Sequence, residues 1–416
     1  MEIPKNSPEI IGNSIQKIVE HNQFNLSVKN FLFVENKKIL FVLLSDNDFV
    51  SRDEISLDNV LLIRNNGKEP KKPLGYVIIY EYIKIKCEKD VNNGEEYKTK
   101  INKLWEKNVL IQTNILFFDE KKEFLCFGND DGSIYIYKTK IEGNFKEMEL
   151  ITELTFHTDR VSGIYLDSNN MNIYSCSYDN TFFVTDLKDN LYTKSLIYNN
   201  ICSFTGLKYI DKNNLFITSD EDGVISIYTN ENSHHKYFTN FLNIQSKSLY
   251  KINTMKIYEN FIIAGENNGK ISIFDLSLIK DKIIKEIINF DIGTFKIICI
   301  DYNSKKDEII IGDENGRIII WNNKIGNYVY SLIAHSQAKI NHLWFEKDKN
   351  ILWTCGDDKI IKIWKIPEKW FKEENNLFIK NNINLDEKQK ENKILDLEEN
   401  ESISSDEDEL NGWSYK

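Results

Sequence analysis

The sequence predicts an all-β fold, a seven-bladed β-propeller followed by a disordered, acidic C-terminal tail. Three observations support this: one turn-and-strand pattern occurs seven times, its copies are evenly spaced, and the chain becomes polar and highly charged after about residue 372. The 416 residues are 41% hydrophobic and 12% aromatic, which is typical of a globular protein with a sizeable core.

The repeated pattern is a polar turn, usually ending in Gly, followed by alternating β-forming residues and an aromatic residue five positions after the turn residue. Gly suits a tight hairpin because it adopts positive φ at little steric cost. Alternation along the following residues is the period of a strand. The clear copies are GYVIIY (75–80), GSIYIY (132–137), GVISIY (223–228), GKISIF (269–274) and GRIIIW (316–321). The degenerate copies are NTFFVT (180–185) and KIIKIW (359–364).

The spacing of the copies indicates one blade for each copy. They end at residues 80, 137, 185, 228, 274, 321 and 364, at intervals of 57, 48, 43, 46, 47 and 43 residues. These intervals lie near the roughly 40–45 residues of a four-stranded propeller blade. Seven ordinary hairpins in a sandwich are the alternative, and the even spacing disfavours it.

Two blades resemble those of the WD-repeat (WD40) superfamily in a set of polar residues known there as the structural tetrad. In the last blade the set is His335, Thr354, Asp358 and Trp364. In the third blade it is His157, Ser175 and Asp179, with Thr185 in the place of Trp. The resemblance implies that Asp accepts a hydrogen bond from the His ring, which bonds the hydroxyl, which in turn accepts from the indole N–H. A Ser/His/Asp catalytic triad is the alternative, but the set recurs with the blade and follows no nucleophile motif.

The expected domain organisation follows from the repeats. Residues 1–13 form an N-terminal arm, 14–371 the propeller and 372–416 the tail. We expect residues 14–20 to cross over as the closing strand of the last blade, which removes an exposed sheet edge. A strand at 377–382 is the competing way to close the ring. The first blade carries an insertion at 46–74, for which a solvated loop is favoured over a contact with a partner or an anionic surface.

Most of the net charge of −11 belongs to the tail. Residues 386–410 contain eleven Asp or Glu and three Lys, a net of −8, so the rest of the chain carries about −3. Such a composition cannot bury enough apolar surface to fold alone. The chain ends in a candidate partner-binding motif, weighed evenly against a chance aromatic residue; its residues are Asp408, Glu409, Leu410, Trp413 and Tyr415.

The sequence predicts no catalytic, cofactor or metal site. The six cysteines form no CxxC pair, which points to reduced thiols and not to a zinc site. GENNGK (265–270) differs from a phosphate-binding loop and fits a blade hairpin. The near-neutral body disfavours DNA binding. With no secretory signal or membrane span in sight, we expect a cytoplasmic protein, in which any membrane contact is indirect.

A narrower resemblance appears in GNFKEMELITELTFHTDRVSGI (143–164) and WTCGDDKIIKIW (353–364). These segments resemble blades of the WD-repeat and FYVE-domain family, whose members bind phosphatidylinositol 3-phosphate through a zinc-binding FYVE insert between their last two blades. In this sequence residues 322–339 occupy that position, and they contain no Cys. Zinc and lipid binding are therefore not carried over.

These observations favour a non-catalytic scaffold or adaptor that binds proteins within a larger cytoplasmic complex, with a link to membrane traffic suggested by the narrower resemblance. Two alternatives remain open. One is a phosphoinositide-binding propeller recruited to membranes, although the Arg-Arg pair of the related autophagy propellers is missing. The other is an RNA-associated WD-repeat protein of ribosome assembly, against which the near-neutral body counts.

Overall fold

The computed structural model describes residues 9–12, 26–34, 38–46, 75–86, 97–109, 112–139, 148–188, 192, 194–229, 239–246, 249–293 and 295–367. The chain divides into two compact units, one of which is Glu9–Ile366. The other unit is Met1–Pro8 together with Pro367–Lys416, in which Pro367 is the only described residue. The tail predicted at 372–416 therefore lies outside the described residues.

The unit Glu9–Ile366 consists of seven four-stranded antiparallel sheets, the blades, whose strands are named in order from the innermost to the outermost. Blade 1 is β2 (Leu26–Val34), β3 (Ile39–Asp46), β4 (Gly75–Lys86) and β5 (Tyr97–Val109). Blade 2 is β6 (Thr113–Asp119), β7 (Phe124–Asn129), β8 (Ile134–Thr139) and β9 (Met148–Leu154). Blade 3 is β10 (Val161–Asp167), β11 (Asn172–Ser177), β12 (Thr181–Asp186) and β13 (Lys194–Asn199).

The remaining blades repeat this order. Blade 4 is β14 (Phe204–Ile210), β15 (Leu215–Asp220), β16 (Val224–Thr229) and β17 (Thr239–Gln245). Blade 5 is β18 (Ile252–Tyr258), β19 (Phe261–Glu266), β20 (Lys270–Asp275) and β21 (Lys285–Asp291). Blade 6 is β22 (Ile297–Asn303), β23 (Glu308–Asp313), β24 (Arg317–Asn322) and β25 (Asn327–Ile333). Blade 7 is β26 (Ile340–Glu346), β27 (Ile351–Gly356), β28 (Ile361–Lys365) and β1 (Glu9–Gly12). Short 3-10 helices lie in blades 4 and 5, namely η3 (Asp211–Asn213) and η4 (Ile279–Asp281).

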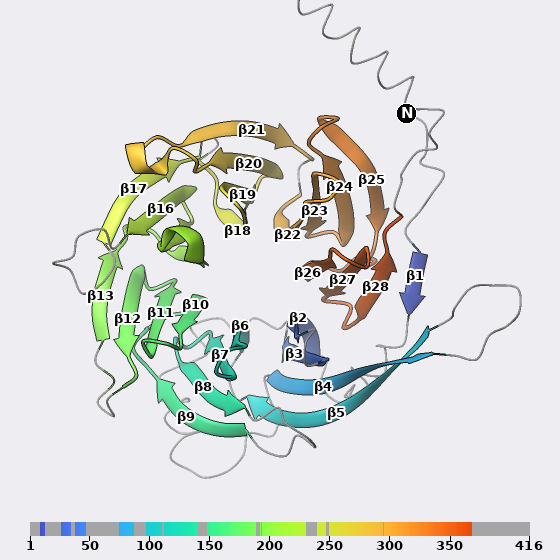
Figure 1. The fold of residues 1–416 in the computed structure, drawn as a ribbon, viewed down its shortest axis with the longest axis horizontal. Coiled ribbons are helices and arrows are strands. Elements are labelled where there is room, and N and C mark those ends of the chain that lie inside the picture. The colour runs from blue at the N-terminus through green and yellow to red at the C-terminus, as the bar shows by residue number, and fades with distance from the viewer. Residues whose placement is uncertain are drawn as a thin grey trace, which may run out of the picture. The chain divides into compact units, whose positions relative to one another are not determined.

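The predicted seven-bladed propeller is confirmed. The blades stand around a common axis, as Figure 1 shows, and the innermost strands of neighbouring blades contact one another all the way round. The ring closes where β2 of blade 1 meets β26 and β27 of blade 7. Each repeated hairpin identified in the sequence supplies the third strand of one blade.

The strand that completes blade 7 is Glu9–Gly12, which lies in the range expected to be an arm. It pairs with β28 in antiparallel register, with Ile10 opposite Trp364. The range 14–20, expected to fill this place, lies outside the described residues, as does the competing range 377–382. The sequence pattern favoured the longer segment because it resembles the other outer strands. A four-residue strand is enough at this position, since an outermost strand is bonded along one edge only. The insertion expected at 46–74 falls between β3 and β4, and residues 47–74 also lie outside the described part of the chain.

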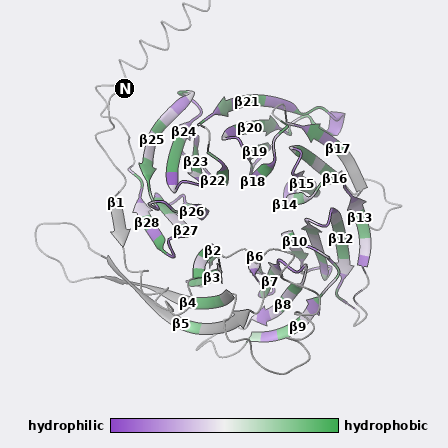
Figure 2. Cartoon of the chain, turned by 180° about the vertical axis from the view of Figure 1, so that it is seen from behind, coloured by the Kyte–Doolittle hydropathy of each residue, from purple (hydrophilic) through white to green (hydrophobic). Residues whose placement is uncertain are grey.

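Burial changes from the middle of a blade to its outside. All six residues of β15 and of β23 are buried, because a second strand is covered on both faces by the neighbouring blades. The outer strand β21 instead alternates exposed and half-buried residues. Figure 2 shows the same contrast as mixed hydrophilic and hydrophobic residues along outer strands such as β21 and β25. The continuous apolar runs of the second strands are therefore the core of the fold.

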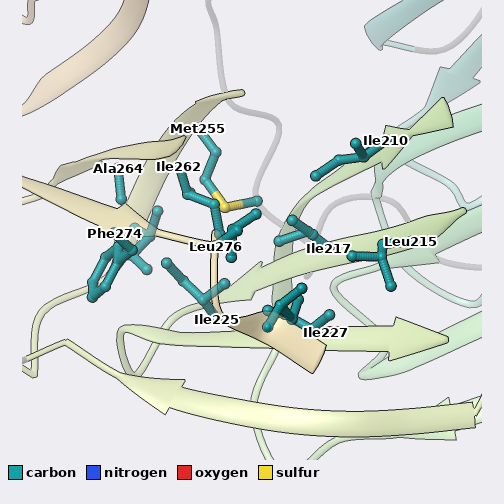
Figure 3. Packing of buried hydrophobic residues seen from close by; sticks show 12 residues of the cluster. Ile210, Leu215, Ile217, Ile225, Ile227, Met255, Ile262, Ala264, Phe274 and Leu276 are labelled. Carbon is teal, nitrogen blue, oxygen red and sulfur yellow. The ribbon is translucent and has the colours of Figure 1, made fainter. Parts of the chain in front are cut away.

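Core clusters form between neighbouring blades. Figure 3 shows one of them, in which Ile217, Ile225 and Ile227 of blade 4 lie beside Met255 and Ile262 of blade 5. Fully burying each such side chain stabilises the fold by about 1.5–3 kcal/mol relative to leaving it exposed. The aromatic residues that end the hairpins take part in similar contacts. Tyr228 of blade 4 meets Phe182 of blade 3 at a centroid distance of 5.0 Å.

In blades 2 to 7 the hairpin turns have the positive φ that the sequence pattern predicts. Gly316 has φ +78°, and a Cβ at this position would lie 1.7 Å from the carbonyl oxygen of His335. This turn therefore requires Gly both for its φ and for its close contact with the loop that leads into blade 7. In the two degenerate copies Asn180 and Lys359 occupy the turn, each with φ +69°.

Candidate interaction surface

The four tetrad residues of blade 7 form one hydrogen-bonded chain. His335 Nδ1 donates to the carboxylate of Asp358 at 2.8 Å, and the Thr354 hydroxyl donates to His335 Nε2 at 2.9 Å. The Trp364 indole Nε1 donates to Thr354 Oγ1 at 3.0 Å. Burial by itself raises the pKa of Asp358, but the hydrogen bond and charge of His335, together with Lys362, hold that pKa below its usual value. This series of hydrogen bonds connects the loop before β26 with the strand β27, with the turn that follows β27, and with β28.

The set in blade 3 has the same geometry without the indole. His157 Nδ1 lies 3.0 Å from Asp179 Oδ2, and His157 Nε2 lies 2.9 Å from Ser175 Oγ. Thr185, in the place of the Trp, is 1% exposed. Ser175 is itself only 3% exposed, so its hydroxyl cannot meet a substrate, although the distances resemble those of a catalytic triad. The geometry therefore fits a structural role, in which buried polar groups satisfy one another.

Blades 4 and 6 stabilise the same turn with a buried carboxylate that the sequence pattern did not reveal. Blade 5 has a buried carboxylate at the equivalent position, which accepts hydrogen bonds from the hydroxyls of Ser246 and Ser272. The carboxylate belongs to the last residue of the second strand, which is Asp220, Glu266 or Asp313. Asp313 Oδ1 accepts hydrogen bonds from the backbone N–H groups of Asn315 and Arg317, both at 2.9 Å. The signal in the sequence is an acidic residue directly before the turn, at the end of an otherwise apolar strand.

These turns lie on one face of the ring, which we call the loop face. There the turn between the second and third strands of a blade meets the loops that lead into the innermost strands. Tyr178 of the blade 3 turn, for example, donates its backbone N–H to the carbonyl of Arg160, the residue before β10, at 2.9 Å. The loop face therefore places residues from distant parts of the chain side by side.

Pairs of oppositely charged residues lie on the loop face, and we call these pairs the charge rim. Each pair brings together a base at or near the start of an innermost strand and an acid in a hairpin turn. The pairs are Arg160–Asp130 at 3.5 Å, Lys251–Glu221 at 2.8 Å, Lys296–Glu314 at 3.3 Å and Lys29–Asp357 at 3.4 Å. Because each base is matched by an acid, these pairs leave little net charge to attract a polyanion.

Large apolar side chains are exposed on the loop face beside this rim. Ile201 is 93% exposed, Leu249 66% and Tyr250 52%, and we call these three residues the apolar patch. Ile201 lies in the loop between blades 3 and 4, where Asn180 Nδ2 donates to its carbonyl at 3.2 Å. The other two lie in the loop between blades 4 and 5, next to Lys251.

The aromatic ring of Tyr178 is flanked by two cations, and one of them, Lys251, directly follows Tyr250 in the chain. Lys251 Nζ lies 5.0 Å from the ring centroid and donates to the Tyr178 hydroxyl at 3.1 Å, and the Arg160 guanidinium carbon lies 5.5 Å from the centroid. Such contacts fix the side chains in one arrangement. The patch therefore stands beside a preorganised set of cationic and aromatic groups.

The backbone of Leu249 is strained. Its φ is +57°, in the left-handed region that disfavours residues with a branched side chain. The 66% exposure of Leu249 means that burial does little to offset this strain. Strained residues that gain little within the fold are concentrated at functional sites, which makes this position a candidate contact with a partner.

The most accessible described thiol does not look reactive. Cys202 donates a hydrogen bond to Asp222 Oδ2 at 2.6 Å. This hydrogen bond, with burial, raises the pKa of Cys202 to about 11, so the thiol stays protonated near neutral pH. Burial likewise raises the pKa of Cys176 to about 12.

A set of polar side chains lies midway along the innermost strands of blades 4 to 7, and we call this set the axis cluster. Its members are Lys208, Lys256, Asp301 and His342, on β14, β18, β22 and β26. Lys256 Nζ lies 2.6 Å from Asp301 Oδ1. Burial lowers the pKa of His342 to about 4, an effect that Asp301 opposes and the two lysines strengthen.

The depressed pKa of His342 leads to an expected pH dependence of stability. Its pKa is about 4 in the folded chain and near 6.5 when unfolded, so the unfolded state binds more protons between these values. Stability should therefore fall as the pH is lowered from about 6.5 to about 4, with a contribution from this residue of about 2 kcal/mol. Urea denaturation of the wild type and of His342→Gln at pH 7 and pH 4.5 measures it. Equal losses in both proteins would contradict the assignment.

The remaining predictions from the sequence concern the tail motif, metal binding and membrane spans. The tail residues Asp408, Glu409, Leu410, Trp413 and Tyr415 lie outside the described residues. Within the described part of the chain, no three or more His, Cys, Asp or Glu side chains gather as they would around a metal ion. The same part contains no helix that is long and apolar enough to cross a bilayer.

Comparison with known proteins supports the propeller. The family model "WD domain, G-beta repeat" matches residues 148–186 and 326–365, which include all residues of the two tetrad sets. Among solved structures, Raptor of Chaetomium thermophilum is 12% identical with a TM-score of 0.59, over 85% of this chain and 30% of the Raptor chain. Sqt1 of Chaetomium thermophilum, bound to the N-terminus of ribosomal protein L10, is 12% identical with a TM-score of 0.54, over 70% of this chain and 78% of that one.

These likenesses establish the fold and transfer no function. The chain spans only 30% of the Raptor chain, and both identities are 12%. The comparison with curated proteins found no match. Nothing found supports the narrower resemblance to the WD-repeat and FYVE-domain family.

Proposed function

Because the chain is a β-propeller of the WD40-repeat superfamily, we propose that it is a non-catalytic scaffold that binds another protein through its loop face. The observation that carries this proposal is the apolar patch, Ile201, Leu249 and Tyr250, whose side chains lie largely in water. An apolar group held exposed on a rigid frame loses stabilisation that a partner surface would restore. The loops that hold these residues are free to differ between propellers, while the blades keep the fold.

The surroundings of the patch favour a protein partner. Aromatic residues and Arg in fixed arrangements are the residues that contribute most to protein interfaces, and Tyr178, Tyr250 and Arg160 provide them in this chain. The paired charges of the rim suit a surface of mixed charge better than a polyanion such as DNA or RNA. The equal numbers of positive and negative charges in the rim also favour an indirect connection to membranes, through a partner in a larger cytoplasmic complex.

A catalytic role has less support. The buried hydroxyl of Ser175 and the protonated thiol of Cys202 are the described groups that most resemble nucleophiles, and neither is both accessible and activated. A protein of the same fold, Sqt1, is crystallised with the N-terminus of a ribosomal protein, so binding of a peptide is compatible with this architecture.

The proposal is tested by comparing the proteins that co-purify with three versions of the full chain. The first is the wild type, the second carries Ile201→Ser with Tyr250→Ser, and the third carries Ile287→Ser. Ile287 is 48% exposed on the outer strand β21, away from the loop face, and serves as the matched control. We expect a partner that is lost from the patch variant and kept by the control. The same partners on all three versions would contradict the proposal.

The tail is proposed as a separate binding element, through the candidate motif that contains Trp413. Removing residues 386–416 should remove one set of partners without affecting those lost from the patch variant. Identical partners with and without these residues would rule out the tail.

The strain at Leu249 predicts that replacing this residue by Gly does not destabilise the fold. Leu249→Gly should leave the fold as stable as the wild type or stabilise it by about 0.5 kcal/mol, because relief of the left-handed conformation exceeds the entropic cost of Gly. Leu196→Gly, at a comparably exposed site in the strand β13 (55% exposed), should instead destabilise it by about 1 kcal/mol. Thermal unfolding of both variants measures the difference. A loss at Leu249 as large as at Leu196 would show that the strain has been misassigned.

A further inference from the structure

An aromatic residue followed two positions later by Asp stands at the end of the innermost strand in three consecutive blades. The pairs are Phe117 with Asp119 in blade 2, Tyr165 with Asp167 in blade 3, and Tyr209 with Asp211 in blade 4. They lie at the ends of β6, β10 and β14, strands that neighbour one another around the ring (Figure 2). Since the innermost strands start at the loop face, these ends belong to the opposite face.

The three aromatic rings form one continuous row. The Tyr165 ring contacts the Phe117 ring at a centroid distance of 5.5 Å and the Tyr209 ring at 4.4 Å. All three residues are half-buried, so part of each remains open to solvent. The Tyr209 hydroxyl donates to Asn214 Oδ1 at 2.8 Å, which holds this ring in place at one end of the row. In the described part of the chain, no cation lies over any of the three rings.

The three carboxylates stand beside this row without a cationic partner. Asp119 and Asp167 face the same way as Phe117 and Tyr165, because residues two apart along a strand lie on one side of it. Asp211 directly follows β14 and is exposed. Burial raises the pKa of Tyr165, and the charges of Asp211 and Asp167 raise it further, which agrees with carboxylates close to its hydroxyl. None of the three carboxylates forms an ion pair with a described residue.

The turns that follow these strands carry an excess of negative charge. Residues 119–123, 167–171 and 211–213 contain five acidic and three basic residues, a net charge of −2. The Lys122 ammonium donates to the carbonyl of Ser168 instead of pairing with one of the three carboxylates. The charge of this part of the opposite face therefore complements a cationic partner.

The same face shows how an aromatic residue beside a carboxylate holds a cation. Tyr258 ends β18, and its ring contacts the Tyr302 ring of blade 6 at a centroid distance of 4.6 Å. The Tyr258 hydroxyl donates to Glu259 Oε1 at 2.8 Å. Lys347, which directly follows β26, places its ammonium 4.8 Å from the centroid of the Tyr258 ring. Blades 5 to 7 therefore supply a cation to this arrangement from within the chain, whereas blades 2 to 4 leave it open.

We propose that the three aromatic residues and three carboxylates of blades 2 to 4, which we call the acidic aromatic surface, bind a partner protein through a segment that carries Arg or Lys. The cation lies over the rings, whose faces are negative, and donates hydrogen bonds to the carboxylates. Arg fits better than Lys, because a planar guanidinium stacks on a ring while it donates to a carboxylate. The surface lies on the face opposite the apolar patch, so it does not depend on the proposed loop-face function.

Fluorescence anisotropy with a labelled octapeptide of alternating Gly and Arg tests the proposal on the full chain. The decisive variant carries Asp167→Asn with Asp211→Asn, since Asn keeps the shape of the side chain and removes its charge. We expect this variant to bind the peptide at least about tenfold more weakly than the wild type. Tyr209→Leu should weaken binding about threefold, whereas Tyr209→Phe keeps the ring and should bind like the wild type.

A charge-matched control carries Asp281→Asn with Asp291→Asn in blade 5. Asp281 lies in the 3-10 helix η4, as Asp211 lies in η3. Asp291 accepts the backbone N–H two residues later in the chain, as Asp167 does. The net charge of the control therefore changes as much as that of the decisive variant, and we expect it to bind the peptide like the wild type.

Three results would overturn the acidic aromatic surface. One is a wild type that does not bind the peptide, and another is equal affinity in the wild type and the decisive variant. The third is an equal loss in the charge-matched control, which would mean a general effect of net charge. The variant that alters the apolar patch should bind the peptide like the wild type, so this proposal and the loop-face function can fail separately.

Discussion

Replacing Thr354 by Val is expected to lower the free energy of unfolding by about 3 kcal/mol, because one hydroxyl connects two buried polar groups. Thr354 is fully buried, donates to His335 Nε2 and accepts from Trp364 Nε1. Val has nearly the same shape, so the change removes the hydrogen bonds and leaves the packing almost intact. Two buried groups then lack a partner, at about 1–3 kcal/mol each. Urea denaturation followed by tryptophan fluorescence measures the loss.

Blade 3 provides the matched control for this prediction. Ser175→Ala removes the equivalent hydroxyl, but Thr185 replaces the indole there, so only His157 loses a partner. We expect a loss of about 1.5 kcal/mol. The double variant Thr354→Val with Trp364→Phe should lose less free energy of unfolding than the two single variants lose together. The reason is that Trp364→Phe removes the indole N–H that Thr354→Val leaves without a hydrogen-bond acceptor. Equal losses in blades 3 and 7, or strictly additive losses in the double variant, would contradict the role assigned to Thr354.

The fold could be predicted because each hairpin turn has a local requirement that leaves its mark on the sequence. Where the loop of the next blade presses on the turn, as His335 does on Gly316, only Gly combines a positive φ with the necessary room. A positive φ at the turn residue recurs in blades 2 to 7, so it produces a period. The two tetrad sets were identified through their resemblance to the WD-repeat superfamily, and their spacing follows the strand lengths.

The loop face and the axis cluster could not be predicted in this way. Ile201 and Leu249 have no periodic neighbours, and their exposure depends on how two loops sit on the blades. The four residues of the axis cluster lie on four different innermost strands, and nothing in the local sequence of Lys256 indicates Asp301 as its partner. Contacts of this kind arise only when the ring is assembled.

The closing strand is another feature whose position could not be predicted from the sequence. Glu9–Gly12 is too short for alternation to be visible, and its partner β28 is about 350 residues away along the chain. Its position depends on the free edge of blade 7, which any short extended segment can pair with through its backbone. The sequence therefore indicated that an N-terminal segment closes the ring, while the choice of segment depended on tertiary structure.

Removing residues 1–12 is expected to destabilise the propeller by about 4 kcal/mol and to promote aggregation. Backbone pairing along β1 contributes about 1 kcal/mol for each hydrogen bond lost, and uncovering β28 opens an edge beside Trp364, which is 5% exposed in the closed ring. Thermal unfolding should show a lower midpoint, and light scattering should show larger particles on storage.

A truncation of residues 1–8 is the control, because it leaves β1 intact and should unfold like the wild type. The comparison also decides between the two candidate segments, since both truncations keep residues 14–20. If this range could complete blade 7, the shorter chain would be as stable as the longer one, and the pairing of Glu9–Gly12 with β28 would be dispensable. A chain that ends at Pro367 removes the third candidate at 377–382 and should keep the wild-type midpoint. A lowered midpoint there would mean that the C-terminal segment, and not the N-terminal one, protects the edge of blade 7.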